Sequence, residues 1–336
     1  MDVTYEGTKR EVATDKGTLR YHEAGDGPPL ILLHGSGIGV SGWRNYRGNL
    51  EVFAKHFHCY ILEFPGFGVS DPVDGHPVLT AASSVIRFMD ALGIESAAMI
   101  GNSMGGVVGV NVAMRFPDRV RKLVTIGGIG PNIFSQNPSE GTRLLQDFAD
   151  APSREKLVRW LECMVYDKTV VTEERIEERW ETANDPASQH ALTAMYGSKA
   201  FVAQQQMMSN SDVPPYWSMM HKVQCPTLLT WGLDDRQCPP DMPMIPMRLI
   251  PNAELHVFPN CGHWVMIEAK EAFERVTLEF LLRWPACAPP VGLEPATCGL
   301  KVGTQTRRLV ILNDERTSFR QVNAGPRSLL ALLQVI

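Results

Sequence analysis

The sequence predicts an α/β fold built on a mostly parallel, doubly wound sheet. Short apolar runs end in polar or glycine-containing loops, and helical patterns separate them. The runs lack the polar–apolar alternation of a half-exposed strand, as expected for strands buried on both faces. Strands that alternate with helices at this density favour a parallel sheet. The runs lie at 30–33, 59–62, 97–100 and 121–126.

Composition restricts the class of protein. The chain has 336 residues, of which 44% are hydrophobic and 21% charged, with a net charge of -5. This mildly acidic balance gives no reason to expect nucleic acid or an anionic membrane as a partner. No apolar run is long enough to span a bilayer, and the polar first residues predict no secretory signal. The seven cysteines show no paired spacing, which is typical of reduced thiols and predicts a cytoplasmic protein.

The first part of the core, residues 1–131, begins with an antiparallel hairpin. Polar and apolar residues alternate over 9–13 and 18–23, on either side of the turn Asp15-Lys16-Gly17. Helices are then expected between the buried strands. They lie at 43–54, at 80–92 with one apolar face, and at 106–114.

A helical segment, residues 132–216, interrupts the sheet pattern after the sixth strand. It contains no convincing strand, and an all-helical insertion in an α/β chain is typical of a lid. Its helices are expected at 140–149, 153–165, 172–183 and 186–208.

The second part of the core, residues 217–285, resumes the sheet. Strands are expected at 227–231 and 254–258, followed by a helix at 265–282. Residues 286–336 show little periodicity, so we expect a poorly ordered tail whose deletion leaves activity intact.

Gly101-Asn102-Ser103-Met104-Gly105 is the first candidate catalytic motif. It follows a predicted strand and precedes a predicted helix, which is the context of a nucleophile elbow rather than a chance Gly-x-Ser-x-Gly match. The tight turn is expected to present the Ser103 hydroxyl at the top of the sheet. The N–H of Met104 lies at the helix N-terminus, where donors are unpaired and the dipole favours an anion. We expect Ser103 to be a nucleophile and Met104 to be an oxyanion-hole donor.

A nucleophilic serine needs a base and a group that orients the base. Asp235 and His263 each follow a late strand, so both are expected at the carboxyl edge of the sheet with Ser103. The order Ser, Asp, His is that of the α/β-hydrolase fold. Asp234 is the alternative acid, and the position in the motif favours Asp235. The second oxyanion donor is expected to be the N–H of Ser36, in the loop after the first buried strand.

Two other patterns indicate different chemistry. Residues 37–42 fit Gly-x-Gly-x-x-Gly, and Glu63 lies at the distance expected in a dinucleotide-binding fold. The hydrolase interpretation uses the same loop and also explains Asp235 and His263, so it is favoured. Residues 56–59 include metal-binding residue types, but no further ligand cluster supports a metal. We expect neither a metal nor a cofactor.

With further local motifs, the chain resembles the meta-cleavage-product hydrolases, the carbon–carbon bond hydrolases of bacterial aromatic and steroid ring degradation. The resemblance covers residues 5–284. Its specific features are Asn102 before the serine, Asn45 in a Trp-x-Asn loop and Arg179 in the helical segment. Further matches are His34-Gly-Ser-Gly, Met164-Val-Tyr-Asp, Glu178-Arg-Trp, Trp231-Gly and Cys261-Gly-His-Trp.

The resemblance implies a small-molecule substrate, a 2-hydroxy-6-oxo-hexa-2,4-dienoate, and hydrolysis of its C5–C6 bond. His263 would first assist ketonisation of the dienol, and the triad would then cleave it to 2-hydroxypenta-2,4-dienoate and a carboxylic acid. A homodimer or higher homo-oligomer is also implied. An ordinary carboxylesterase with the same triad is the alternative.

The resemblance also implies binding residues. Carbon–carbon cleavage expels a carbanion, so positive charge near the substrate carboxylate and 2-oxygen would stabilise the leaving dienolate. Arg179 offers a planar, bidentate fork for that role. Asn45 and Asn102 would hydrogen-bond the same polar end, and Trp264 is carried over as a pocket residue.

Two departures from the family pattern concern geometry. Ile38 stands where the family usually has Pro, which predicts a less rigid oxyanion loop. The proline-rich stretch 239–246 replaces a clean helix after Asp235. The C6 substituent stays open, and apolar residues of the distal pocket are expected to select it, among them Met164, Met207 and Trp217.

Overall fold

The computed structural model describes residues 3–67, 69–209 and 214–283. Its core is an eight-stranded sheet with the strand order β1-β2-β4-β3-β5-β6-β7-β8. β2 pairs antiparallel with β1 and β4, and the other neighbouring strands are parallel. The predicted α/β class is therefore confirmed. The strands are β1 (Lys9–Thr14), β2 (Gly17–Ala24), β3 (Pro29–Leu33), β4 (His58–Leu62), β5 (Ala97–Asn102), β6 (Val120–Ile126), β7 (Thr227–Gly232) and β8 (Ala253–Phe258).

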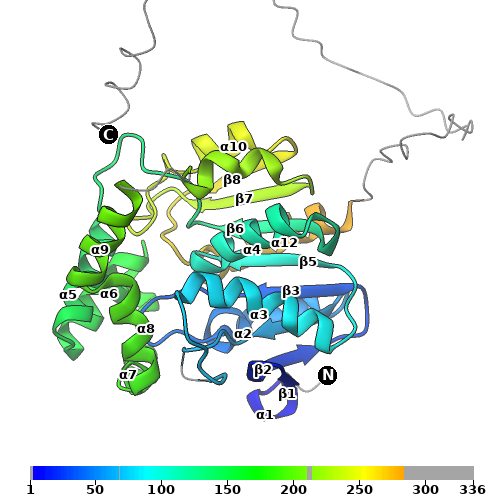
Figure 1. The fold of residues 1–336 in the computed structure, drawn as a ribbon, viewed down its shortest axis with the longest axis horizontal. Helices are drawn as coiled ribbons and strands as arrows, with labels where there is room; N and C mark the ends of the chain where they lie inside the picture. Colours follow the sequence, from blue (N-terminus) through cyan, green and yellow to red (C-terminus); the bar gives the residue numbers. More distant parts are fainter. Residues whose placement is uncertain (1–2, 68, 210–213, 284–336) are drawn as a thin grey trace, which may run out of the picture. The chain divides into compact units, whose positions relative to one another are not determined.

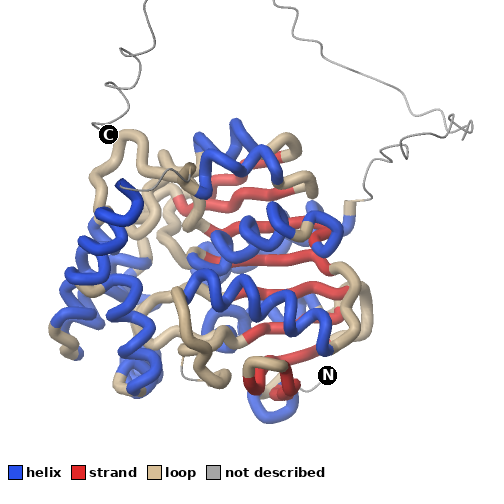
Figure 2. The backbone as a smooth tube through the Cα atoms, in the orientation of Figure 1, coloured by secondary structure: helices blue, strands red, loops and turns tan. Residues whose placement is uncertain are grey.

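Helices cover both faces of the sheet (Figures 1 and 2). Along β3, Leu30 and Leu32 belong to one apolar cluster, whereas Ile31 and Leu33 belong to the other. Successive side chains of a strand point to opposite faces, so a sheet covered on both faces needs apolar residues at every position. One cluster includes α2 (Gly42–Phe53) and α12 (Lys270–Leu282), and the other includes α3 (Pro77–Ala91) and α4 (Met104–Arg115).

A group of helices that follows β6 and precedes β7 in the chain lies beyond one end of the strands (green in Figure 1). Most of these helices follow a capping residue whose side chain accepts a hydrogen bond from a backbone N–H of the first turn. This N–H has no hydrogen-bond acceptor within the helix itself. The capping residues are Ser139, Ser153, Thr172 and Asp185. The helices are α5 (Glu140–Asp150), α6 (Arg154–Met164), α7 (Glu173–Ala183), α8 (Pro186–Tyr196) and α9 (Ser198–Ser209).

Two predicted helices are broken. The single helix expected over 186–208 ends at Gly197, whose ψ of 140° leaves the helical region, and α9 restarts where the Ser198 N–H donates to Asp150 Oδ1 over 2.9 Å. The helix expected over 265–282 consists of α11 (Val265–Glu268) and α12, separated at Ala269. Apolar residues keep a helical spacing across the second break, which is why the sequence did not reveal it.

The proline-rich stretch does contain a helix, α10 (Met244–Leu249). Pro243 is its N-cap and Pro246 lies in its first turn. Proline is tolerated there because first-turn N–H groups have no partner inside the helix. A short helix thus begins inside the stretch, whereas residues 239–243 are not helical.

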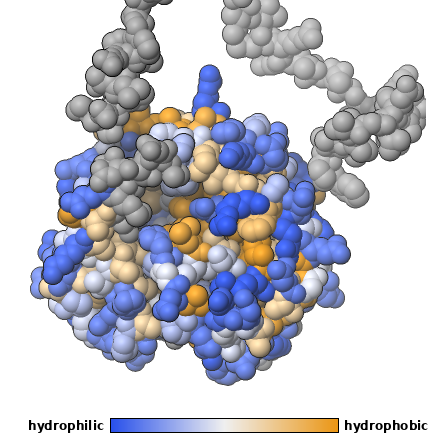
Figure 3. Space-filling model, in the orientation of Figure 1, coloured by the Kyte–Doolittle hydropathy of each residue, from blue (hydrophilic) through white to orange (hydrophobic). Residues whose placement is uncertain are grey.

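The remaining short elements are α1 (Tyr5–Thr8), η1 (Pro117–Arg119), η2 (Lys168–Val170) and η3 (Tyr216–Lys222). None of the helices in the described part of the chain is long and apolar enough to cross a membrane. Hydrophilic residues cover much of the face seen in Figure 3, with smaller apolar patches between them. The predicted tail, residues 286–336, and the Met207 side chain lie outside the described residues.

Candidate active site

Ser103 lies in a strained turn between β5 and α4. Its φ of 53° and ψ of -116° are rare for a residue with a side chain, and such a conformation costs about 1–3 kcal/mol. The Ser103 N–H donates to Ile126 O over 2.8 Å, which ties the turn to β6. A Cβ on Gly105 would lie 2.1 Å from Leu33 O, so only glycine fits there. The structure therefore has the geometry of a nucleophile elbow at Ser103.

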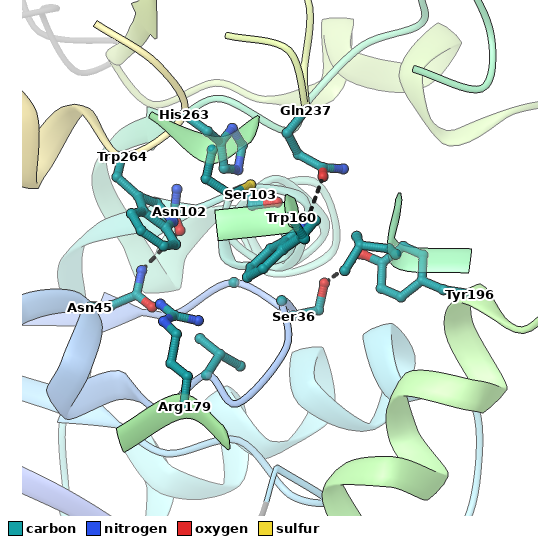
Figure 4. Close-up of a pocket in the computed structure, with 15 residues that line it drawn as sticks. Ser36, Asn45, Asn102, Ser103, Trp160, Arg179, Tyr196, Gln237, His263 and Trp264 are labelled. Atoms are coloured by element: carbon teal, nitrogen blue, oxygen red, sulfur yellow. Dashed lines mark hydrogen bonds between the residues drawn. The ribbon is translucent and has the colours of Figure 1, made fainter. Parts of the chain in front are cut away.

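Asp235 and His263 lie next to each other at the same edge of the sheet (Figure 4 shows His263 beside Ser103). Asp235 Oδ2 and His263 Nδ1 are 2.7 Å apart, and both side chains are almost fully buried. The other carboxylate oxygen accepts the backbone N–H groups of Gln237 and Cys238 over 2.9 and 2.7 Å. It is thus Asp235, and not the neighbouring Asp234, that the structure pairs with His263.

The Asp235 carboxylate controls the charge of His263. Burial, the largest single influence, lowers the pKa of His263, but the Asp235 carboxylate and Cys238 together raise it, so that the net shift is upward, to about 10. The Nδ1–H donates to Asp235, which leaves the Nε2 lone pair for a proton. Gly127 and Gly128 have positive φ values of 61° and 81°, and they pack against His263 and Ser103 respectively. A Cβ on Gly127 would lie 2.9 Å from His263 Cε1, and one on Gly128 would lie 2.4 Å from Ser103 Cα.

The loop after β3 lies against the nucleophile. A Cβ on Gly35 would be 3.3 Å from Ser103 Cβ, so the next residue, Ser36, has its backbone close to the Ser103 side chain. His34 braces the loop: its Nε2 accepts the Phe64 N–H over 2.9 Å, so its Nδ1–H donates to Gly35 O over 2.6 Å. Burial lowers the pKa of His34 to about 4, which keeps the imidazole neutral in that role. Ser36 is buried, as is Met104, the first residue of α4, where N–H groups are unpaired.

The sequence-predicted polar residues come together on one side of Ser103. Arg179 of α7 donates to Ile38 O over 2.7 Å, which ties the helical segment to the loop after β3. Asn45 Nδ2 donates to Asn102 Oδ1 over 2.9 Å, and Asn102 Nδ2 donates to Ile126 O over 3.1 Å. The Asn102 amide therefore orients Asn45, which leaves Asn45 to face the pocket (Figure 4).

Arg179 is a buried cation without an acidic partner. It is 4% exposed, and among the described residues no carboxylate lies within ion-pair distance of it. Its guanidinium carbon lies 4.6 Å from the ring centre of Trp264 and 5.7 Å from that of Trp160. Burial and the nearby charges of Arg44 and Arg175 lower the pKa of Arg179 to about 9. A buried charge is costly unless it is paired, so this side chain fits an anionic ligand.

Comparisons with known proteins agree with this geometry. The model of the alpha/beta hydrolase fold matches residues 28–270. A 2-hydroxy-6-oxononadienedioate/2-hydroxy-6-oxononatrienedioate hydrolase of Comamonas testosteroni is 39% identical over 268 residues, which are 78% of this chain and 91% of the relative. A 2-hydroxy-6-oxo-6-phenylhexa-2,4-dienoate hydrolase of Burkholderia cepacia is 38% identical over 270 residues, with the same 78% and 91% coverage. The chain belongs to the meta-cleavage-product hydrolases.

A solved structure supports the same assignment. A meta-cleavage product hydrolase from Pseudomonas fluorescens matches with a TM-score of 0.73 and 29% identity, over 82% of this chain and 97% of that chain. The predicted family and the α/β-hydrolase fold are thus confirmed for this hydrolase. The roles of its individual side chains stay predictions.

The other side of the hydrolase pocket was missed by the sequence analysis. Trp160 of α6 donates from Nε1 to Gln237 Oε1 over 3.4 Å, and Gln237 Nε2 donates to Thr142 Oγ1 over 3.2 Å. Tyr196 of α8 shares a 2.7 Å hydrogen bond with Ser36 Oγ. In Figure 4 Gln237 and Tyr196 lie on the far side of the pocket from Arg179 and Asn45, and Trp160 lies between the two sides. Helical periodicity predicts that Trp160 and Tyr196 are buried, but not which surface they meet.

The site is nearly closed. Its cavity is about 20 Å³, which is room for about one water molecule. Trp160 fills much of the space, since a Cβ on Gly37 would lie 2.3 Å from its ring. Met164 lines the cavity, whereas Trp217 does not. A dienoate therefore needs side chains or helices of the 132–216 segment to move before it can bind.

The patterns that suggested other chemistry have structural roles. The Glu63 carboxylate accepts the Gly42 and Trp43 N–H groups over 2.7 and 2.9 Å at the start of α2. His58 stacks on Tyr60, with ring centres 4.3 Å apart, whereas the next residue, Cys59, is buried on the opposite face of β4. Neighbouring residues of a strand that face opposite ways do not share a metal ion.

Asp235, Cys238 and His263 offer metal-ligand atoms that lie within 4.8 Å of one another. The Asp235 oxygens already accept two backbone N–H groups and the imidazole proton. A metal would have to displace that proton. The donor set therefore fits a hydrogen-bonded acid–base pair better than a metal site.

Proposed function

We propose that this hydrolase cleaves the C5–C6 bond of 2-hydroxy-6-oxo-hexa-2,4-dienoates with the triad Ser103, His263 and Asp235. The observation that carries the proposal is the buried, unpaired Arg179 in the same pocket as the His263–Asp235 pair. An ester offers no group that needs such a cation, whereas a dienoate has both a carboxylate and a 2-oxygen that gains charge. The similarity to relatives with dienoate hydrolase names adds support.

The first step is ketonisation. The neutral Nε2 of His263 takes the proton of the 2-hydroxyl and a proton is delivered to C5, which gives a 2,6-dioxo-hex-3-enoate with no net change in atoms. Arg179 and Asn45 hold the carboxylate and the 2-oxygen, and Asn102 acts through Asn45 as a positioning residue. The raised pKa of His263 favours its protonation by an acid as weak as a dienol.

Cleavage follows at C6. Ser103 Oγ attacks the C6 carbonyl as His263 takes its proton, and the N–H groups of Ser36 and Met104 stabilise the oxyanion. Breaking C5–C6 places the electron pair in a dienolate that extends to the 2-oxygen beside Arg179. Protonation of that oxygen gives 2-hydroxypenta-2,4-dienoate. Water activated by His263 then hydrolyses the acyl-serine to the carboxylic acid.

Loss of the visible absorbance of the dienolate tests the proposal. We expect wild-type enzyme to bleach a panel of ring-cleavage products. Arg179→Gln is expected to slow this reaction by about 10²–10³-fold, because the charge that stabilises the leaving dienolate is lost, while hydrolysis of a neutral aryl ester is largely spared. Equal loss on both substrates would favour the alternative, a carboxylesterase that uses the same triad.

The sequence identities to the relatives do not indicate which C6 substituent the substrate of this enzyme carries. One relative is named for a nonadienedioate and the other for a 6-phenyl substrate, and the two are 39% and 38% identical to this chain. The panel therefore needs both substrate types.

Three further features are part of the proposal. The helical segment 132–216 acts as a lid, because its helices close a cavity too small for substrate. The enzyme is a homodimer or larger oligomer, which light scattering tests. It acts in the cytoplasm, as the free cysteines of the described residues suggest, and fractionation of cells that express it tests this.

A further inference from the structure

A second cavity, of about 130 Å³, adjoins the polar end of the active site. It lies where α7 meets α2, α11 and the start of α12, and it shares Asn45 and Arg179 with the active-site pocket. We call it the cationic vestibule. Its charged lining residues are Arg44, Arg47, Arg175, Arg179, Lys270 and Glu178.

The vestibule carries an excess of positive charge. Glu178 is the acid of the lining: it accepts two hydrogen bonds from Arg47, over 3.0 and 3.1 Å, and lies 3.7 Å from Arg44. Arg175 donates instead to a backbone carbonyl, that of Val170, over 2.9 Å. Lys270 pairs at 2.8 Å with Glu274, which lies outside the lining. Within the described lining, Glu178 thus faces more cations than it neutralises.

The charges of the vestibule act on Arg179. Arg44, Arg175 and Arg47 each disfavour its charged form, and Glu178 opposes them. A buried guanidinium surrounded by other guanidinium groups becomes more stable when an anion arrives. The whole chain has a net charge of -5, so a local positive opening guides an anion that the rest of the surface repels.

We propose that the cationic vestibule is an anion-binding entry site that takes up the substrate carboxylate and passes it to Arg179. This inference rests on the proposed function, because the anion is that of the dienoate. The vestibule is larger than the active-site cavity of about 20 Å³, and Asn45 and Arg179 line both. In the proposed route the carboxylate enters first and the C6 substituent follows. The dienoate product, also an anion, leaves by the same route.

Charge variants of opposite sign test the proposal. Arg47→Gln removes a half-exposed rim cation, and Glu178→Gln removes the rim acid. For a dienoate at low salt, we expect kcat/KM to fall by about 3–10-fold in the first and to rise by a similar factor in the second, because rim charge sets the association rate. Both effects should disappear at about 0.5 M salt, where exposed charges are screened.

Two controls separate steering from other causes. Arg121→Gln removes one charge from an exposed side chain in β6 that bonds Ser96 and does not line the vestibule. It should change kcat/KM by less than twofold. A neutral aryl ester should show no salt dependence in any variant. The proposal is wrong if Arg121→Gln matches Arg47→Gln, if the change persists at high salt, or if the ester responds equally.

A probe that is not cleaved separates this inference from the proposed function. Hexa-2,4-dienoate is a stable anion of related shape, and we expect it to inhibit hydrolysis of the neutral ester competitively. Its inhibition constant should rise in Arg47→Gln and with salt. If dienoates are not cleaved but this inhibition pattern is observed, anion binding at the vestibule is supported and the proposed carbon–carbon hydrolysis is wrong. If dienoates are cleaved but the inhibition pattern is absent, only the proposal of an anion-binding vestibule is wrong.

Discussion

The two ends of the active-site pocket, on either side of Ser103, are built differently. One end holds a buried cation, Arg179, and the Asn45–Asn102 pair. The other holds neutral groups that hydrogen-bond one another, among them Trp160 and Gln237. A charged end suits the part of a substrate that leaves as an anion. A neutral, aromatic end suits a substituent that does not change charge during the reaction.

The ends also differ in what positions them. Asn45 comes from α2 and Asn102 from the end of β5. The helical segment contributes Arg179, which donates to Ile38 O in the core. At the other end, Trp160 and Tyr196 come from α6 and α8 of that segment. If the proposed roles hold, the chemistry is anchored mainly in the core, whereas the neutral end, apart from Gln237, comes from the more easily changed insertion.

The largest effect is expected when Asp235, which orients the base for every substrate, is changed. Asp235→Asn should lower kcat on dienoates and esters alike by about 10³–10⁴-fold. Without the carboxylate, the main contribution that raises the pKa of His263 is lost, so that burial brings this pKa below its wild-type value. The imidazole must be neutral to act as a base, so the acid limb of the pH profile should move to lower pH. Profiles of kcat/KM against pH for the wild type and for Asp235→Asn test the sign, and a move of the acid limb to higher pH would contradict it.

Asn102→Ala should affect the charged end selectively. It removes the acceptor of Asn45 Nδ2 and leaves a buried donor unpaired, which costs about 1–3 kcal/mol. We expect dienoate turnover to fall by about 10–100-fold and ester turnover by much less. Single-turnover kinetics that separate ketonisation from cleavage provide the measurement. An equal fall for esters would mean that Asn102 supports the Ser103 turn rather than Asn45.

Gln237→Leu should affect the neutral end selectively. The change removes a polar group from the pocket wall and the acceptor of the Trp160 indole. The ratio of kcat/KM for a 6-phenyl dienoate to that for a nonadienedioate should rise by about tenfold. Thr142→Val is the matched control, because Thr142 bonds Gln237 but does not line the pocket. If both variants shift the ratio equally, Gln237 acts only by bracing Trp160.

The difference between the ends also explains what the sequence could predict. Ser103, Asp235 and His263 each follow a strand, so strand order alone brings them to one edge of the sheet. Asn45 and Arg179 were identified through short motifs of the family. The sequence did not indicate Trp160, Gln237 and Tyr196, because their role depends on how helices of the insertion pack on the core. The break at Gly197 was also missed; next to it the Ser198 N–H bonds Asp150, a residue that is distant in the sequence.

The smallest expected effect tests whether the neutral end also contributes to the chemistry. The Tyr196 hydroxyl bonds Ser36 Oγ, and the Ser36 backbone N–H is a proposed oxyanion donor. Tyr196→Phe should lower kcat by about 2–10-fold, as expected for the loss of one neutral hydrogen bond. Because the oxyanion forms on every substrate, the loss should be the same for dienoates and esters.

A double-mutant cycle makes this last test decisive. Ser36→Ala keeps the backbone N–H but removes the partner of Tyr196, so it should reproduce the effect of Tyr196→Phe. The double variant should then be no slower than either single variant, since both remove the same interaction. Additive losses, or a loss confined to one C6 substituent, would show that Tyr196 only shapes the pocket. In that case the neutral end would select substrates without taking part in their conversion.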